Sequence, residues 1–168
     1  DLINLRGKKY DGKRNHLKKF KKKYSYNYCK LTPVHINGCL EVLDRWYSQH
    51  CEHWECSLSL LNEIAACRQA LENYQLLGLK GGIIEVDKKI VAFSLGEKLN
   101  KNTAVIHFEK VDEDYQELAA VINQEYAAAE CGNYQYINRE EDLGEPGLRA
   151  SKLSYHPAYL VDKYYIVF

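Results

Sequence analysis

Hydrophobic and polar residues alternate along the chain in segments that predict both helices and strands. In residues 12–23, Leu17 and Phe20 share one face while lysines cover the others, a pattern typical of a short helix that docks through a narrow apolar stripe. In residues 24–31, tyrosines recur at every second position, as in a half-buried strand. The N-terminal part of the chain is therefore predicted to be a basic helix followed by the first strand.

Two consecutive helices are predicted next. Apolar residues recur at helical spacing from Gly38 and again from Ser57, which is a good N-cap. Gly78 stands where a left-handed C-terminal cap would fall, so the second of these helices should end near Leu77.

The rest of the chain predicts mainly strands. The apolar runs 81–86 and 90–96 have the spacing of a hairpin, and 103–109 is a third run rich in β-branched residues. The remaining segments are a helix over 112–131, a strand over 134–138, a short helix over 145–154 and a closing strand over 162–168. This is the element order of a GNAT (acyl-CoA N-acyltransferase)-like α/β fold, with a mixed, mostly antiparallel sheet flanked by helices.

Length and charge change this picture in two ways. The 168 residues suit one domain, and no apolar stretch approaches the roughly 20 residues needed to cross a bilayer. The net charge is zero, but residues 1–30 hold 11 Lys or Arg against Asp1 and Asp11, a balance of +9. The basic segment either attracts polyanions such as tRNA, acidic lipids or phosphates, or is simply a solvated basic helix.

The six cysteines show no spacing of a disulfide framework, so reduced thiols in a cytoplasm are expected. The cluster from His50 to Cys56 contains the residue types that zinc prefers, but its spacing matches no established zinc motif. An ordinary helix end is the favoured interpretation, and no metal is predicted.

The stretch from Tyr136 to Pro157, with Asn138-Arg139-Glu140-Glu141-Asp142 near its start, resembles the signature of the phosphatidylglycerol lysyltransferase C-terminal domain family. Similar support comes from segments spread over almost the whole chain, namely Lys13-Arg14-Asn15-His16 with Phe20, Gly78-Leu79-Lys80-Gly81-Gly82, Ile106-His107-Phe108-Glu109-Lys110 and Lys163-Tyr164. The Asn-Arg-Glu-Glu-Asp form is similar to that of a soluble branch with no assigned substrate.

This resemblance implies a tandem of two GNAT-like domains in one parent chain. Residues 1–23 would be the basic helix at the junction with a preceding domain, and residues 24–168 the C-terminal GNAT-like domain. Family members with an assigned activity move an aminoacyl group, usually lysyl, from tRNA to the headgroup of phosphatidylglycerol. The implied partners are aminoacyl-tRNA as donor and an anionic lipid headgroup or small amine as acceptor.

GNAT enzymes bind the pyrophosphate of acyl-CoA on a glycine-rich loop at a helix N-terminus. Here the equivalent segment 110–115 has no glycine and carries three carboxylates, at Asp112, Glu113 and Asp114, which would repel a pyrophosphate. Standard CoA binding is therefore disfavoured. An acyl-CoA-dependent N-acyltransferase and a non-catalytic GNAT-fold binding module stay as alternatives to an aminoacyltransferase.

Aminoacyl transfer needs a base and groups that hold the developing oxyanion. His107 and Glu109 fall on one face of the strand 103–109 because side chains alternate, so they either act in one cleft or form an unremarkable exposed face. In the signature, Arg149 and Lys152 share a helix face beside Asp142, which we predict to be the base or the amine anchor. An ion network that only fixes the loop is the alternative.

The remaining candidate residues are expected to bind substrates. The substrate-binding candidates are Asn138, Arg139, Glu140, Tyr155 and Lys163. Lys13, Arg14 and His16 are predicted to bind anions, either a phosphate of the tRNA acceptor stem or a lipid headgroup, with solvation of the helix as the alternative.

Overall fold

In the computed structural model, which describes residues 1–51, 58–164 and 166–167, five strands form one sheet in the order β1-β2-β3-β4-β5. The strands are β1 (Tyr26–Lys30), β2 (Lys80–Val86), β3 (Lys89–Lys98), β4 (Thr103–Val111) and β5 (Tyr136–Asn138). Successive strands pair antiparallel, except that β5 is parallel to β4. The predicted mixed, mostly antiparallel sheet is confirmed.

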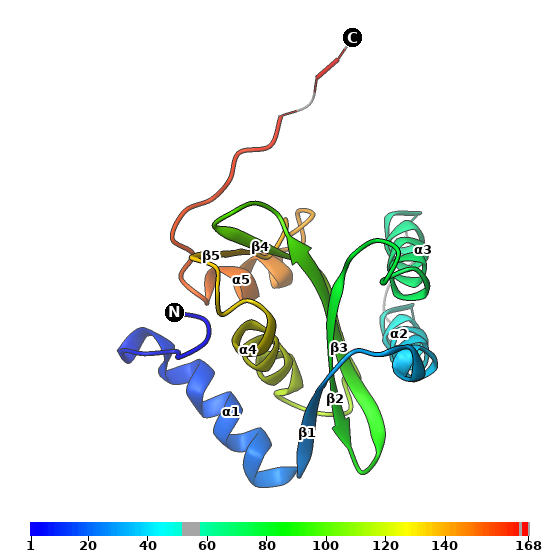
Figure 1. Cartoon of the computed structure of the whole chain (residues 1–168). Helices are drawn as coiled ribbons and strands as arrows, with labels where there is room; N and C mark the ends of the chain where they lie inside the picture. Colours follow the sequence, from blue (N-terminus) through cyan, green and yellow to red (C-terminus); the bar gives the residue numbers. More distant parts are fainter. Residues whose placement is uncertain (52–57, 165, 168) are drawn as a thin grey trace.

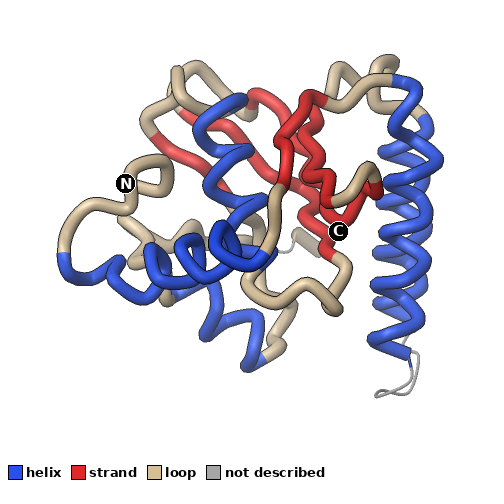
Figure 2. The backbone as a smooth tube through the Cα atoms, turned by 90° about the horizontal axis from the view of Figure 1, so that it is seen from below, coloured by secondary structure: helices blue, strands red, loops and turns tan. Residues whose placement is uncertain are grey.

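Helices cover both faces of the sheet (Figure 1). They are α1 (Asp11–Lys23), α2 (Ile36–Cys51), α3 (Leu58–Glu72), α4 (Leu118–Glu130) and α5 (Pro146–Leu153), with two 3-10 turns at Lys8–Tyr10 and Pro33–His35. Figure 2 shows α2 and α3 side by side on one side of the sheet. The helices α1 and α4 pack on the other side, and α1 contacts α4 directly.

Each sheet face has its own apolar core. Val42, Leu43 and Leu71 of the α2–α3 pair pack with Ile83 and Phe93 in a fully buried cluster. On the opposite face, Phe20 of the basic helix is only 1% exposed and packs with residues of α4 and the sheet. The narrow stripe predicted for residues 12–23 therefore anchors α1 to the domain.

The helix predicted over 112–131 begins later, at Leu118, so the prediction was wrong for its first six residues. The fully buried Asp112 carboxylate lies 2.9 Å from Arg45 Nε and 3.3 Å from Lys89 Nζ. The Asp114 N–H also donates to Asp112, over 3.3 Å. These bonds hold residues 112–117 as a loop, because a buried carboxylate must keep its cationic partners.

Two further boundaries differ from the sequence-based expectation. The helix α3 ends at Glu72 rather than near Leu77, although Gly78 does adopt the expected left-handed conformation (φ +68°). Residues 73–78 form turns that bury Tyr74.

The closing strand predicted over 162–168 is absent from the described residues of that segment. The segment runs away from the domain, as the red end of the chain in Figure 1 shows. Its apolar side chains remain largely exposed, at 83% for Tyr164, 77% for Ile166 and 92% for Val167. Within this chain no burial of apolar surface drives these residues to pair with β5.

The prediction of reduced thiols was only partly right. Cys29, Cys39, Cys67 and Cys131 are free, but Cys51 takes part in a disulfide. Most of the cluster from His50 to Cys56 lies outside the described residues. The residues that are described include no group of three or more potential metal ligands.

Candidate functional site

The sheet opens where β4 and β5 separate. Their parallel pairing covers only three positions, from Thr103↔Tyr136 to Val105↔Asn138. The strand β4 continues to Val111, so in the described part of the chain its last six residues have no strand partner on this side. The side chains of this open edge are available for contacts with the signature loop that follows β5.

Glu109 of β4 and Arg139 of the signature loop form the central contact at this opening. Arg139 Nη2 lies 3.2 Å from Glu109 Oε1, and Asn123 Nδ2 of α4 donates to Glu109 Oε2 over 3.0 Å. The Glu109 and Arg139 side chains are only 15% and 19% exposed. Two buried atoms remain without a hydrogen-bond partner, Arg139 Nη1 and Asn123 Oδ1, so one donor and one acceptor are unused here.

His107 joins the same group from two residues earlier on β4. Its Nε2 atom lies 3.0 Å from Glu97 Oε1 of β3, and its Nδ1 atom lies 3.1 Å from Glu140 Oε1. Two carboxylates thus fix the orientation of the imidazole ring. We call His107, Glu109, Asn123, Arg139 and Glu140 the polar strip.

Tyr155 connects the polar strip to a hollow. Arg139 Cζ lies 4.6 Å from the centroid of the Tyr155 ring, and Lys13 Nζ lies 4.0 Å from the same centroid. Burial raises the pKa of the Tyr155 hydroxyl to about 12. Burial and the charge of Arg139 lower the pKa of Lys13.

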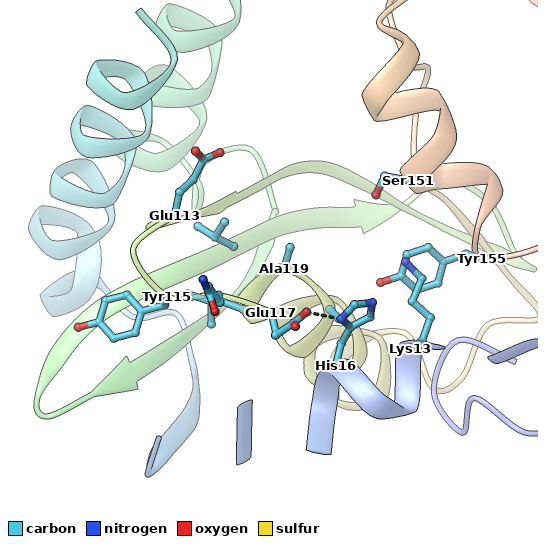
Figure 3. Close-up of a pocket in the computed structure, with 12 residues that line it drawn as sticks. Lys13, His16, Glu113, Tyr115, Glu117, Ala119, Ser151 and Tyr155 are labelled. Atoms are coloured by element: carbon cyan, nitrogen blue, oxygen red, sulfur yellow. Dashed lines mark hydrogen bonds and ion pairs between the residues drawn. The ribbon is translucent and has the colours of Figure 1, made fainter. Parts of the chain in front are cut away.

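The hollow itself has a volume of about 310 Å³ and lies between α1, the start of α4 and the end of α5 (Figure 3). Lys13 and Tyr155 line one end with Ser151, while Glu113 and Tyr115 line the part nearer β4. His16 Nδ1 contacts Glu117 Oε2 at its wall. This size is at the lower end of the range for small-molecule sites.

The start of α4 is neutralised by the protein itself. Glu117 has a left-handed backbone (φ +69°) immediately before the helix, and its carboxylate contacts His16 and lies 3.7 Å from Lys19 Nζ. A carboxylate beside a helix N-terminus interacts favourably with the helix dipole, although Glu117 makes no capping hydrogen bond here. The three carboxylates predicted at this terminus, those of Asp112, Glu113 and Asp114, lie instead in the loop before it, so Glu117 is the acidic residue at the start of α4.

Asp142 and Arg149 form a bidentate ion pair in the signature loop. Arg149 Nε lies 2.8 Å from Asp142 Oδ2, and Arg149 Nη2 lies 2.9 Å from Asp142 Oδ1. The hydrogen bond from Arg149, with one from the Gly144 N–H, lowers the pKa of Asp142 to about 2. A carboxylate with so low a pKa is a poor proton acceptor at neutral pH, so the geometry favours the alternative that this pair fixes the loop.

Lys152 and Lys163 also act on the signature loop. Lys152 Nζ donates to the carbonyl oxygens of Arg139 and Glu141, over 2.7 and 2.6 Å. Burial, together with the charge of Arg139, lowers the pKa of Lys152. Lys163 Nζ lies 3.0 Å from Glu141 Oε1 and 3.8 Å from Glu140 Oε2.

The predicted anion-binding residues have different environments. Arg14 donates to the carbonyl oxygens of Leu5 and Gly7 and contacts Asp11, so its guanidinium fixes the N-terminal segment. His16 contacts Glu117, as described above. Lys13 is different, because none of the described carboxylates forms an ion pair with it.

Three residues of these networks were missed by sequence reasoning. Glu97 and Glu117 are ordinary surface carboxylates in the sequence, and no motif singles them out. Asn123 lies beside the apolar stripe of α4 and is 1% exposed. An amide directly next to Val121 and Ile122 was the available signal, because a buried polar group needs a partner.

Comparison with known proteins agrees with the signature. The family model for the C-terminal region of phosphatidylglycerol lysyltransferase matches residues 1–167. The chain belongs to this family. The fold and the transferase class suggested by the sequence resemblance are thereby supported.

Among solved structures, a conserved protein of unknown function from Bacteroides thetaiotaomicron VPI-5482 is 43% identical, with a TM-score of 0.88 over 95% of this chain and 54% of that one. An uncharacterized protein of Mycoplasmoides gallisepticum is 26% identical over 98% of this chain and 53% of its own length. This lysyltransferase-family chain therefore spans about half the length of these relatives.

More distant structures share the fold. The C-terminal domain of a putative lysylphosphatidylglycerol synthetase from Agrobacterium fabrum is 19% identical, with a TM-score of 0.62 over 94% of this chain and 55% of that one. A ribosomal-protein-alanine N-acetyltransferase from Brucella melitensis is 12% identical, with a TM-score of 0.56 over 86% of this chain and 99% of that one. The fold is therefore GNAT-like.

No helix in the described ranges is both long and apolar enough to cross a membrane.

Proposed function

We propose that this chain is the C-terminal domain of an aminoacyltransferase that moves an aminoacyl group from tRNA to a lipid headgroup or a small amine. Family membership supports the transferase class. The observation that carries the proposal is the polar strip, in which the His107 imidazole lies near a buried Arg139 N–H group that has no hydrogen-bond partner. The neutralised start of α4 favours an aminoacyl ester over acyl-CoA as donor.

In this proposal His107 is the general base. The Nδ1 atom exchanges its contact with Glu140 for the attacking hydroxyl or amine and removes the proton of that group, while Nε2–H stays bonded to Glu97. The new ester or amide bond forms at the aminoacyl carbonyl carbon. The ester bond to the tRNA ribose breaks, and His107 returns the proton to the leaving hydroxyl. Glu97 holds the orientation of the ring throughout the reaction.

Arg139 supplies the positive charge of the site. Its Nη1 group is the buried donor without a partner, so it is suited to the oxyanion that develops on the carbonyl. Glu109 and Asn123 position this guanidinium. Asn138, Lys152 and Lys163 support the loop, and Asn138 does so through its Oδ1 atom, which accepts from the Glu140 N–H over 2.8 Å.

The rest of the parent protein enters as part of the same proposal. We expect a GNAT-like domain before α1 to complete the channel for tRNA, and we expect the protein to work in the cytoplasm. The exposed lysines of α1, including Lys18 and Lys22, would then face the tRNA or an acidic lipid surface.

The test is transfer of a labelled amino acid from aminoacyl-tRNA by the full-length protein. His107→Gln should lower the rate by about 10²–10⁴-fold, the usual contribution of a general base. His35→Gln is the matched control, because His35 lies outside the polar strip and its imidazole bonds to Thr32. Equal rates for wild type and His107→Gln would remove the catalytic assignment.

The donor class needs a separate measurement. Saturating acetyl-CoA should leave the melting temperature unchanged, since a ligand that binds the folded state raises it. A clear rise would favour the acyl-CoA-dependent alternative.

A further inference from the structure

We propose that Lys13 and Tyr155 form a subsite for a phosphodiester group of a substrate at one end of the hollow. The proposal rests on the proposed function, because both tRNA and a phospholipid carry a phosphodiester close to the hydroxyl that takes part in transfer. It deepens that function by separating one residue, Lys13, from the other cations of the basic helix.

The first argument is the unmatched charge of Lys13. Its side chain is half-buried, with Nζ over the Tyr155 ring, and no carboxylate of the described residues forms an ion pair with it. Lys19 and Lys21 of the same helix differ, since Lys19 lies 3.7 Å from Glu117 and Lys21 lies 3.8 Å from Glu125. A half-buried cation is costly without a counter-charge, and an anionic ligand would supply one.

The second argument is the neighbouring guanidinium. Arg139 lies against the same Tyr155 ring, and partial burial, together with the charge of Arg139, lowers the pKa of Lys13. Glu109 partly offsets the Arg139 charge, but Glu109 does not line the hollow. Two cations that meet at one aromatic ring therefore leave this end of the hollow electropositive.

The third argument is accessibility. Lys13, Ser151 and Tyr155 all line the hollow, and Figure 3 shows them at the same end of it. Glu113 lies away from this end, 3.5 Å from His50, and the Glu117 carboxylate is directed at His16. An anion is therefore directed to Lys13.

A phosphodiester fits these groups better than a carboxylate does. An ammonium acts as a compact point charge for phosphate, whereas a planar carboxylate is best matched by a guanidinium fork. The Ser151 hydroxyl can donate to a second phosphate oxygen. Since Arg139 connects Tyr155 to Glu109, a phosphate at Lys13 would direct the adjoining ester toward the unused Arg139 Nη1 group.

The test is binding of two small phosphodiesters to this chain by isothermal titration in a phosphate-free chloride buffer. Glycerophosphoglycerol represents the lipid headgroup, and cytidylyl-(3′→5′)-adenosine represents the tRNA end. We expect at least one to bind with a millimolar Kd, and Lys13→Gln to weaken it at least tenfold. The probe that binds identifies the source of the phosphate.

Two variants keep the result interpretable. Lys101→Gln removes an exposed lysine between β3 and β4 that does not line the hollow, and this variant should bind as wild type does. Lys13→Arg keeps the charge and should retain most of the affinity, even if loss of charge in Lys13→Gln disturbs folding. The subsite proposal would be overturned if neither probe bound at a concentration of about 10 mM. It would also be overturned if wild type and Lys13→Gln bound the probe with equal affinity.

Failure of the subsite and failure of the proposed function give different results. His107→Gln leaves Lys13 and Tyr155 in place, so it should bind the phosphodiester normally while losing transfer. Binding that depends on Lys13 in a protein with no transferase activity would keep the subsite and remove the proposed function. If neither probe binds and Lys13→Gln transfers the aminoacyl group at the wild-type rate, the proposed function is kept and the subsite is removed.

Discussion

Arg139 Nη2 lies 3.2 Å from Glu109 Oε1, so one ion pair joins the signature loop to the open edge of β4. Glu109→Gln should destabilise the protein by about 2–3 kcal/mol, because it leaves a mostly buried guanidinium without its counter-charge. Both side chains are partly exposed to solvent, so the expected loss of stability is smaller than the loss caused by breaking a fully buried ion pair. Urea unfolding measures the change in the free energy of unfolding.

Glu72→Gln is the control for this prediction. Glu72 is exposed at the end of α3, and its replacement should change stability by less than about 0.5 kcal/mol. If both variants lose the same stability, the ion pair does not hold the loop to the strand.

The sequence predicted most of the fold because the relevant signals are local. The stripe of Leu17 and Phe20, the alternating tyrosines of β1 and the hairpin of β2 and β3 each lie within a few residues of each other. The failures depend on distant partners. The late start of α4 follows from the contacts of Asp112 with Arg45 and Lys89, which no pattern around residue 112 reveals.

The candidate site was partly predictable for the same reason. Alternation in β4 placed His107 and Glu109 on one face, and both do contact the signature loop, through Glu140 and Arg139. The sequence did not show that Asp142 and Arg149 would bind each other, because the loop between them determines that contact. Their catalytic roles stay predictions.

The ion pair of Asp142 predicts a specific pH dependence. The folded-state pKa of about 2 is below the ordinary value of 3.8, so the contribution to stability is present above about pH 4 and is lost as pH falls through 2. The difference in the free energy of unfolding between wild type and Asp142→Asn should therefore shrink between pH 4 and pH 2. Denaturant titrations across this range measure it, and a difference that stays constant would contradict the assigned pKa.

Buried thiols should be unreactive in the folded protein. Burial raises the pKa of Cys39 and of Cys67 to about 12, so almost no thiolate is present at pH 8. Iodoacetamide should label both residues in urea but leave them unmodified in native protein, as peptide mass spectrometry can show. Cys29 is only partly buried and provides an internal comparison, since it should react before them. Native labelling of Cys39 at the rate of Cys29 would show that the α2–α3 core opens.

Gly96 is required where β3 and β4 change register. The pairing shifts between Leu95 and Gly96, and a Cβ atom at Gly96 would lie 2.2 Å from the carbonyl oxygen of Val105. It would also lie 2.9 Å from the Tyr126 hydroxyl, which donates to the Lys80 carbonyl oxygen. Because a backbone oxygen cannot move aside without disturbing the sheet, Gly96→Ala should cost about 1–3 kcal/mol or more.

Gly147→Ala should have the opposite sign. Gly147 lies in α5, and a Cβ atom at this position would have no neighbouring atom within 4 Å, so alanine adds helix propensity without a clash. The expected gain is about 0.5–1 kcal/mol. Urea unfolding gives the free energy of unfolding of Gly96→Ala and Gly147→Ala. Comparison of the two values separates the steric clash at the register shift from a general effect of replacing glycine. Destabilisation of both by similar amounts would remove the argument that the β3–β4 shift needs a residue without a side chain.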